Sequence, residues 1–292
     1  MKYSYYLIDA FTSQPFQGAP IAVFPEAKSL SDSQMQMIAR ELNQAETVFI
    51  LPGDNVHASE IRIFAPQSEL GFSVHPVIAA SYALFKDKKI STGENKLKIS
   101  LGTINVHVSE KEKIQFSINA ETKMDDFVPS ARELGEILHL NENDIDLLRY
   151  KAMISVCGES FLIVPVKSRV QLDKAHFSEE KWTMSFVATL ARQILLFCEN
   201  KEDQNIDFNA RLFGKGIAYN EDPPIGTSIP AFGNYIFSEM KDGVHTAILQ
   251  RGGDGRRVSV IEVEVNKKQG EILDIKVGGH AVMTGEGCIY LD

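Results

Sequence analysis

The sequence predicts a fold that mixes strands and helices and in which one arrangement of them occurs twice. Apolar residues switch along the chain between the alternation of strands and the spacing of helices. Two segments about 150 residues apart, Arg62–Phe64 and Arg211–Phe213, each precede a loop, a proline and a helix rich in small residues. With 292 residues, the chain is long enough for two domains of ordinary size. The pattern therefore favours an internal repeat, to which chance similarity between two strand–loop–helix units is the alternative.

The first pass of this pattern ends before residue 120. The helix Ser31–Leu42 begins at a residue that can cap it, either Ser31 or Asp32. The helix His75–Phe85 is mostly apolar, as a buried helix is, and its Pro76 is tolerated in the first turn. Strands are expected at Tyr3–Asp9, Ala19–Phe24, Thr47–Leu51, Glu60–Ala65, Leu97–Leu101, Ile104–Ser109 and Ile114–Ile118.

The second pass follows residues 119–150, which we interpret as a connector because they contain a proline and an acidic run. A short helix is expected inside this stretch near Ala131–Leu138. Two further helices, Lys181–Leu196 and Ile225–Phe237, belong to the second pass, and we expect the latter to be buried. Strands are expected at Met153–Val156, Phe161–Val166, Asn209–Phe213, His245–Leu249, Ser259–Val265, Ile272–Val277 and Cys288–Leu291.

Charge and composition argue against several classes of protein. Thirty basic and thirty-nine acidic residues leave a net charge of −9, whereas a nucleic-acid surface needs a positive field. No apolar stretch approaches the roughly 20 residues that cross a membrane, and the first residues do not read as a signal peptide. The three cysteines, Cys157, Cys198 and Cys288, form no metal-binding or disulfide pattern. We therefore expect a cytoplasmic protein that binds neither nucleic acid nor membrane.

Two candidate site residues of the first pass stand at the ends of predicted elements. Glu46 lies between the helix Ser31–Leu42 and the next strand, where a carboxylate can point into a cleft. A solvated glutamate in a loop is the alternative. His75 stands in the first turn of the apolar helix, whose free amide groups and dipole suit an anion. A capping or core histidine is the alternative there.

The second pass contains a comparable segment, Glu221–Ser228. It places Asp222 and two prolines before the start of a helix. Gly226 allows close approach of the backbone, and Thr227 and Ser228 supply hydroxyl and amide donors. An ordinary capped helix start is the alternative.

The glycine-rich segment Arg251–Arg256 carries a weaker signal. It lacks the glycine spacing of a nucleotide-binding loop. Arg256 and Arg257 could hold a carboxylate, but we expect a solvated hairpin there. The histidines show no spacing with cysteine or carboxylate residues that predicts a metal site.

Several motifs follow one another along nearly the whole chain. They are Asp9–Thr12 (D-x-F-T), Phe16–Val23 (F-x-G-N-P-x-A-V), Leu42–Phe49 (L-N-x-S-E-T-x-F), Arg62–Pro66 (R-x-F-T-P), Glu69–Pro76 (E-L-x-F-x-G-H-P), Glu221–Thr227 (E-D-P-x-T-G-S), and Gln250, Arg256–Ser259 and Val277–Val282 (Q-G, R-P-S and V-G-G-x-A-V). In this order they resemble the phenazine-biosynthesis isomerase (PhzF-like) family, within the diaminopimelate-epimerase fold. Each motif alone is weak, but their order along the chain is specific.

The resemblance implies an α+β fold of two pseudo-symmetric halves, each a curved, mostly antiparallel sheet wrapped around a central α-helix. The N-terminal half would span residues 1–120, with a return strand near residues 280–292 as a candidate addition. The C-terminal half would span residues 121–292 as a pseudo-repeat. The helices that start near His75 and Gly226 would be the central ones, with both N-termini facing an active-site cleft between the halves. Members of the family often form homodimers, and we expect one here.

The resemblance also implies a cofactor-independent isomerase that moves a proton at a carbon of a small carboxylic acid. Glu46 would be the general acid and base, and Asp222 and His75 would assist it. Burial in a closed cleft would raise the pKa of such a carboxyl group, and helix N-termini would stabilise negative charge. Neither metal nor nucleotide is required. The positions expected to contact substrate are Gly18, Ser73, Val74, Gly226, Thr227 and Ser228, with Thr227 in place of a serine.

Several positions depart from the family pattern toward apolar side chains. Val74 replaces a glycine, Ala19 an asparagine, Ala45 a serine, and Ile225 and Val77 each a threonine. We therefore predict a shifted or smaller substrate rather than the phenazine precursor. A non-catalytic member of the family that binds a small ligand or a protein is the alternative. A racemase with a pair of cysteines is disfavoured, because no cysteine lies near Val74 or Gly226.

Overall fold

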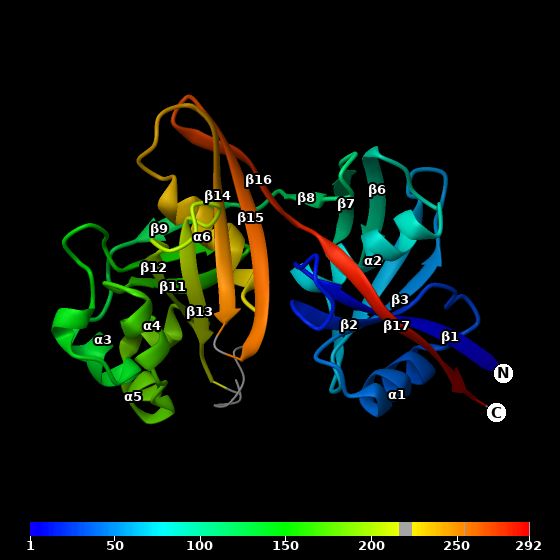
Figure 1. Ribbon diagram of the computed structural model, residues 1–292, viewed down its shortest axis with the longest axis horizontal. Helices are drawn as coiled ribbons and strands as arrows, with labels where there is room; N and C mark the ends of the chain where they lie inside the picture. Colours follow the sequence, from blue (N-terminus) through cyan, green and yellow to red (C-terminus); the bar gives the residue numbers. More distant parts are fainter. Residues whose placement is uncertain (216–223, 254, 292) are drawn as a thin grey trace. The chain divides into compact units, whose positions relative to one another are not determined.

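The computed structural model describes residues 1–215, 224–253 and 255–291, and its fold is mixed α/β with a large curved sheet (Figure 1). Within these ranges, no helix is long and apolar enough to cross a membrane. Two compact units make up the chain, and neither is a single stretch of sequence. Unit 1 comprises Met1–Ser117, Arg257–Val260 and Val277–Asp292, and unit 2 comprises Ile118–Arg256 and Ile261–Lys276.

The strands of unit 1 form a mainly antiparallel sheet. They are β1 (Lys2–Ala10), β2 (Ala19–Phe24), β3 (Thr47–Pro52), β4 (Ser59–Phe64), β5 (Glu69–Leu70), β6 (Gly93–Ile99), β7 (Gly102–Val108), β8 (Ile114–Ile118) and β17 (Ala281–Tyr290). β1 lies between β2 and β17 and is antiparallel to both; β1 is blue and β17 red in Figure 1. β2 then pairs parallel with β3, β3 antiparallel with β4, and β4 parallel with β6. The far end of the sequence thus completes the sheet of the first strands.

One helix of unit 1 is buried and the other covers the outside of the sheet. α2 (Val74–Lys86) is buried from Val74 through Leu84 and contacts β1, β2, β3, β4 and β17. α1 (Asp32–Leu42) packs through one apolar stripe on a cluster that includes Phe49 of β3. Ser31 caps α1, and Gln34 completes a capping box. Both helices of the first pass are therefore confirmed.

The strands of unit 2 repeat an order of pairings found in unit 1. They are β9 (Thr122–Asp125), β10 (Met153–Cys157), β11 (Glu159–Pro165), β12 (Gln193–Glu199), β13 (Phe208–Phe213), β14 (Gly243–Gly253) and the larger parts of β15 (Arg256–Lys268) and β16 (Glu271–Gly279). β10 and β11 are antiparallel, β11 and β12 parallel, β12 and β13 antiparallel, and β13 and β14 parallel. The pairings that join β1, β2, β3, β4 and β6 follow the same succession.

Unit 2 also contains a buried helix, α6 (Ile229–Ile236), which follows the 3-10 turn η3 (Gly226–Ser228). α6 is buried through Tyr235 and contacts β9, β10 and β11. A Cβ atom added at Gly233 would lie 2.6 Å from a methyl group of Val263, so this glycine allows α6 to approach β15 closely. The buried helix expected at Ile225–Phe237 is confirmed.

Buried polar groups fix α6 in place. Ser155 of β10 donates to the carbonyl of Ala231 at 2.7 Å and accepts from Asn234 at 3.0 Å. At the other end of the helix, the buried Lys267 donates to three carbonyl groups. Those carbonyls belong to Phe237, Ser238 and Met240. The position of α6 therefore depends on hydrogen bonds as well as on apolar packing.

Two expectations for the second half are wrong. Instead of one helix over Lys181–Leu196, this described stretch contains the end of α5 (Glu179–Met184), the 3-10 turn η2 (Phe186–Thr189) and the start of β12. Residues 194–198 of β12 are all buried, and such a strand lacks the alternation that would distinguish it from a buried helix.

Residues 119–150 are also more than a connector. They contain β9, α3 (Ala131–Leu138) and η1 (Glu142–Asp144), and they belong to unit 2. Leu134 and Leu138 of α3 share an apolar cluster with Trp182. The helix expected at Ala131–Leu138 is confirmed. Its apolar face packs in the core and so joins the segment to unit 2. The last strand, β17, is likewise longer than the expected Cys288–Leu291.

Candidate active site

Glu46 lies in the turn between α1 and β3. α1 ends at Asn43 in the left-handed conformation, and β3 begins at Thr47. Phe49 of β3 packs in the cluster beneath α1. Side chains alternate along a strand, so Thr47 shares the face of Phe49. The buried helix α2 also contacts β3.

Ser73 connects this turn to the start of α2. It is the N-cap residue of the helix and is 3% exposed, but its hydroxyl caps none of the helix amide groups. The Ser73 side chain instead hydrogen-bonds the carboxyl group of Glu46. A helix start and a carboxyl group from separate elements are thereby held together.

The surroundings of Glu46 raise its pKa to about 7. Burial is the main cause, because removal of water destabilises the charged carboxylate. The hydrogen bond with Ser73 acts in the opposite direction, because it stabilises the charged form. With a pKa near 7, acid and base forms are both populated at neutral pH, as a group that takes and returns a proton requires. Glu46 as a whole residue is partly exposed, and its role as acid and base stays a prediction.

His75 and Val74 lie in the first turn of α2. His75 is 2% exposed. Its ring makes an edge-to-face contact with the ring of Phe11, with the centroids 5.2 Å apart and the ring planes at 86°. Val74 is fully buried. The structure thus brings Glu46, Ser73, Val74 and His75 to one end of α2, where the first amide groups of the helix lack partners within the helix.

Gly18 closes the loop that follows β1. Its φ is +67°, and an added Cβ atom would lie 2.2 Å from the carbonyl oxygen of Ala10, so no other residue fits without movement of the backbone. Its N–H donates to the carbonyl of Val258 at 2.7 Å. The described contacts of Gly18 are therefore structural, and its expected contact with substrate stays a prediction.

An ion pair between Arg257 and a buried carboxylate holds the same loop, and it corrects the expectation of a solvated hairpin at Arg257. Arg257 Nη2 lies 2.5 Å from Asp9 Oδ1, and Asp9 Oδ2 accepts from the N–H of Phe16 at 2.7 Å. Asp9 is 2% exposed; burial raises its pKa and Arg257 opposes that rise. Asp9 stands in the first motif of the sequence and Arg257 in the Arg256–Ser259 motif, and these two motifs were the available signal for this contact.

Of the candidates in unit 2, Gly226, Thr227 and Ser228 form η3, directly before α6. Gly226 and Ser228 are buried, and Thr227 is partly exposed. Ser228 Oγ donates to the carbonyl of Ile225 at 2.7 Å, which closes the turn. Asp222 lies outside the described residues.

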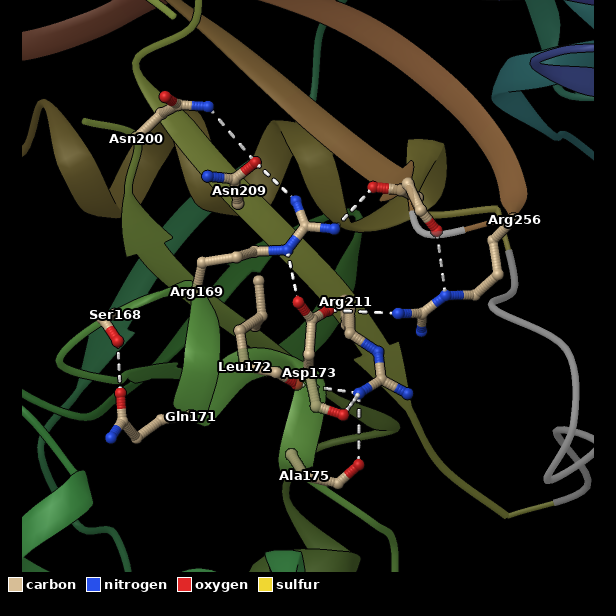
Figure 2. Close-up of polar contacts among 12 residues, drawn as sticks. Ser168, Arg169, Gln171, Leu172, Asp173, Ala175, Asn200, Asn209, Arg211 and Arg256 are labelled. Atoms are coloured by element: carbon tan, nitrogen blue, oxygen red, sulfur yellow. Dashed lines mark hydrogen bonds and ion pairs between the residues drawn. The ribbon is translucent and has the colours of Figure 1, made fainter. Parts of the chain in front are cut away.

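A polar cluster around α4 (Arg169–Lys174) in unit 2 was missed by the sequence analysis (Figure 2). Arg169 donates to Asp173 at 2.8 Å, to Asn209 of β13 at 2.9 Å and to the carbonyl of Gly252 of β14 at 2.8 Å. Arg256, expected in a solvated hairpin, binds Asp173 at 3.1 Å. These contacts join α4 to three strands, so we assign the cluster a structural role.

The repeated R-x-F motif has the same local geometry in both units. The guanidinium group of Arg62 lies over the ring of Phe64, 5.2 Å from its centroid. Arg211 lies over Phe213 at 4.7 Å. Arg62 also binds Glu69 through two nitrogens, at 2.8 and 2.7 Å, and Arg211 donates to carbonyl groups at the end of α4. Both arginines therefore support the scaffold.

Metal ligation receives no support from the described ranges. In residues 1–215, 224–253 and 255–291, no group of three or more histidine, cysteine, aspartate or glutamate side chains is arranged to hold a metal ion. Cys157 and Cys198 are buried, and burial raises the pKa of each thiol to about 11. A thiol with such a pKa is a poor nucleophile at neutral pH.

Comparisons with known proteins agree with the motifs. Residues 8–287 match the model of the family described as phenazine biosynthesis-like protein (PhzC-PhzF). An uncharacterized isomerase of Clostridium acetobutylicum is 30% identical, over 100% of this chain and 99% of the relative. A trans-2,3-dihydro-3-hydroxyanthranilate isomerase of Pseudomonas chlororaphis is 28% identical, over 98% and 99%. The crystal structure of a PhzF-family phenazine biosynthesis protein of Bacillus anthracis has a TM-score of 0.89, with 24% identity and full coverage of both chains.

These relatives are named isomerases, and isomerase is therefore the enzyme class of this chain. The chain belongs to the phenazine biosynthesis-like (PhzF) family, because the family model spans nearly all of it. The resemblance predicted from the motifs is thus confirmed.

Proposed function

We propose that the protein is a cofactor-independent isomerase that moves a proton at a carbon of a small carboxylic acid, with Glu46 as the acid and base. The observation that carries the proposal is the carboxyl group of Glu46, with a pKa of about 7 beside the start of a buried helix. As a carboxylate, Glu46 would take a proton from one carbon. As a carboxylic acid, it would return that proton to another carbon, so that protons balance over one turnover.

The N-terminal ends of two helices would bind the substrate. Free amide groups and the helix dipole stabilise a carboxylate and the negative charge that develops on proton abstraction. The start of α2 and the turn η3 before α6 are the ends that we propose for this role. His75 would assist from α2, and Asp222 would assist from the second half of the chain.

The proposal retains two pseudo-symmetric halves with a cleft between them. It is supported by the buried helix in each unit and by the recurring order of strand pairings. Residues 1–120, with the strand near residues 280–292, would form one half, and the remainder of residues 121–292 would form the other. A homodimer in the cytoplasm is part of the same proposal.

For the substrate, we propose a small cyclic carboxylic acid. The relative from P. chlororaphis is named for a cyclic amino acid, trans-2,3-dihydro-3-hydroxyanthranilate. Val74 and Ile225, which replace smaller or more polar family residues, are both fully buried here. We therefore propose a substrate smaller than, or different in shape from, the compound in that name.

Solvent exchange tests the proposal. The wild type, Glu46→Gln and Glu41→Gln would be incubated in deuterated water with trans-2,3-dihydro-3-hydroxyanthranilate and a panel of small cyclic carboxylic acids. NMR would follow deuterium bound to carbon. We expect exchange in the wild type and at least a 1,000-fold loss in Glu46→Gln, because the glutamine amide cannot carry the proton.

Glu41→Gln is the matched control, because Glu41 is an exposed carboxylate on α1, five positions before Glu46. It should exchange like the wild type. Equal exchange in Glu46→Gln and the wild type would contradict the proposal. Binding without exchange for every acid in the panel would instead favour the non-catalytic alternative.

A further inference from the structure

The loop from Phe11 to Gly18 holds two aromatic residues in a backbone conformation that large side chains rarely adopt. Phe11 has a φ of 63° and Phe16 a φ of 66°. Backbone strain of this kind persists where the surroundings fix it, and it is concentrated at functional sites. The other non-glycine residues with positive φ in the described part of the chain all end helices or turn between strands: Asn43, Lys88, Glu112, His139 and Gln269.

The surroundings of this loop fix it at several points. The N–H of Phe16 donates to the buried Asp9, which is held by Arg257. Arg257 also donates to the carbonyls of Gln17 at 2.7 Å and Gly18 at 2.9 Å. Gln17 Oε1 accepts from a backbone N–H of β15 at 2.7 Å. The backbone of Phe16 is therefore fixed before any ligand binds.

The two aromatic rings of the loop have opposite surroundings. Phe11 is fully buried, and its ring contacts His75 near the start of α2. Phe16 is 71% exposed. The loop thus begins against the helix end that carries Ser73, the partner of Glu46, and presents one large apolar side chain to solvent. A glycine or asparagine would satisfy the backbone at position 16 more easily, so the turn alone does not explain a phenylalanine.

We propose that Phe16 is a specificity-determining residue whose ring packs against the apolar carbon skeleton of the carboxylic acid substrate. This inference rests on the proposed function of the Glu46 site. Ligand sites commonly combine a few polar groups that orient the ligand with aromatic side chains that cover its apolar part. Phe16 would supply the aromatic cover, and the fixed backbone of the loop would reduce the freedom that is lost on binding.

Binding of two simple acids tests the assignment. Calorimetry would measure the dissociation constants of anthranilate, which has a ring, and acetate, which has none, for the wild type and Phe16→Ala. We expect Phe16→Ala to weaken anthranilate binding about fivefold to tenfold, because contact with an aromatic ring is lost. Acetate binding should change less than twofold. An exposed side chain contributes little to stability, so the melting temperature should stay within about 2 °C.

Phe127→Ala is the matched control, because Phe127 is a similarly exposed phenylalanine, 63%, in unit 2. It should leave both dissociation constants unchanged. Equal effects of Phe16→Ala on the two acids, no effect on either, or a wild type that binds neither would overturn the inference. Glu46→Gln separates the two proposals: it should still bind anthranilate through Phe16, whether or not the wild type catalyses proton exchange.

Discussion

Burial and a hydrogen bond act in opposite directions on the carboxyl group of Glu46. Burial raises its pKa, and the Ser73 side chain lowers it, with a result of about 7. Ser73 can do this because it leaves the usual role of an N-cap residue unfilled. The Ser73 hydroxyl group thus partly offsets the effect of burial on the acidity of the proposed acid and base.

Ser73→Ala should shift the pH dependence of activity toward higher pH. Without the hydrogen bond, the charged form of Glu46 loses stabilisation and its pKa rises above 7. At a given acidic pH, less Glu46 is then in the base form. The acid limb of the kcat/KM profile therefore shifts to higher pH. At pH 6 we expect a loss of roughly threefold to tenfold. A pH series of exchange rates measures this shift.

Ser81→Ala provides the control for that series. Ser81 is also buried on α2, and within the described residues its hydroxyl has no hydrogen-bond partner. The substitution should leave the pH profile unchanged and should not lower the melting temperature, because an unsatisfied buried hydroxyl is costly. A profile for Ser73→Ala that superimposes on the wild type would refute the role assigned to Ser73.

Among single residues, the sequence predicted the cluster at the start of α2 better than it predicted the ion pair that fixes the neighbouring loop. Glu46, Ser73 and His75 all lie in short motifs, and the structure brings them to one helix end. The ion pair of Asp9 and Arg257 joins residues 248 positions apart. No local pattern encodes such a distance, so only the resemblance to a family marked these two positions.

The two buried helices are held in different ways. α2 is surrounded by apolar contacts with the strands of unit 1. α6 is also fixed by Asn234 in its last turn and by the Lys267 ammonium group beyond its end. A cation at the C-terminal end of a helix complements both the helix dipole and the free carbonyls. The orientation of η3, at the other end of α6, depends on these anchors.

Lys267→Met should destabilise the protein by about 2–3 kcal/mol, because three carbonyl groups lose a charged donor that is itself buried. Methionine retains the length and the apolar part of the side chain. Urea unfolding would measure the loss. Lys268→Met, at the exposed neighbouring position, should cost less than about 0.5 kcal/mol. Equal stabilities of the two variants would show that the hydrogen bonds of Lys267 do not stabilise the protein.

At the scale of elements, periodicity predicted helices with a clear polar face or a clear cap. α1 and α3 each have a capping box, and both were located from sequence. β12 was not, because its buried run of Ile194–Phe197 looks the same to a period analysis as a buried helix. The short helix α4 was also missed, since its stability comes from the contacts of Arg169 and Arg211 rather than from its own sequence.

Unit 1 depends on the far end of the chain. β17 pairs with β1 from Lys2↔Tyr290 to Ala10↔Ala281, with one shift in register. Arg257, also from the far end, neutralises the buried Asp9. The first 120 residues therefore contain most of the strands of unit 1, but they lack β17, one of the two neighbours of β1.

A fragment of residues 1–120 should accordingly fail to fold cooperatively. Its β1 would expose an unpaired edge, and Asp9 would be left buried without its partner, each of which is costly. Circular dichroism and a thermal scan would show a broad transition or none, and a synthetic peptide of residues 277–291 should partly restore structure. A sharp transition in the isolated fragment would contradict this dependence.

The most direct test of the account is a titration of Glu46 itself. In protein labelled with ¹³C at glutamate carboxyl carbons, Glu46→Gln would identify the Glu46 resonance, and its shift would be followed from pH 3 to pH 9. We predict a midpoint near pH 7, because the buried carboxyl group holds its proton beyond the range of ordinary glutamates. A midpoint near 4.5, the ordinary value, would contradict the claim that this site is prepared for proton transfer at neutral pH.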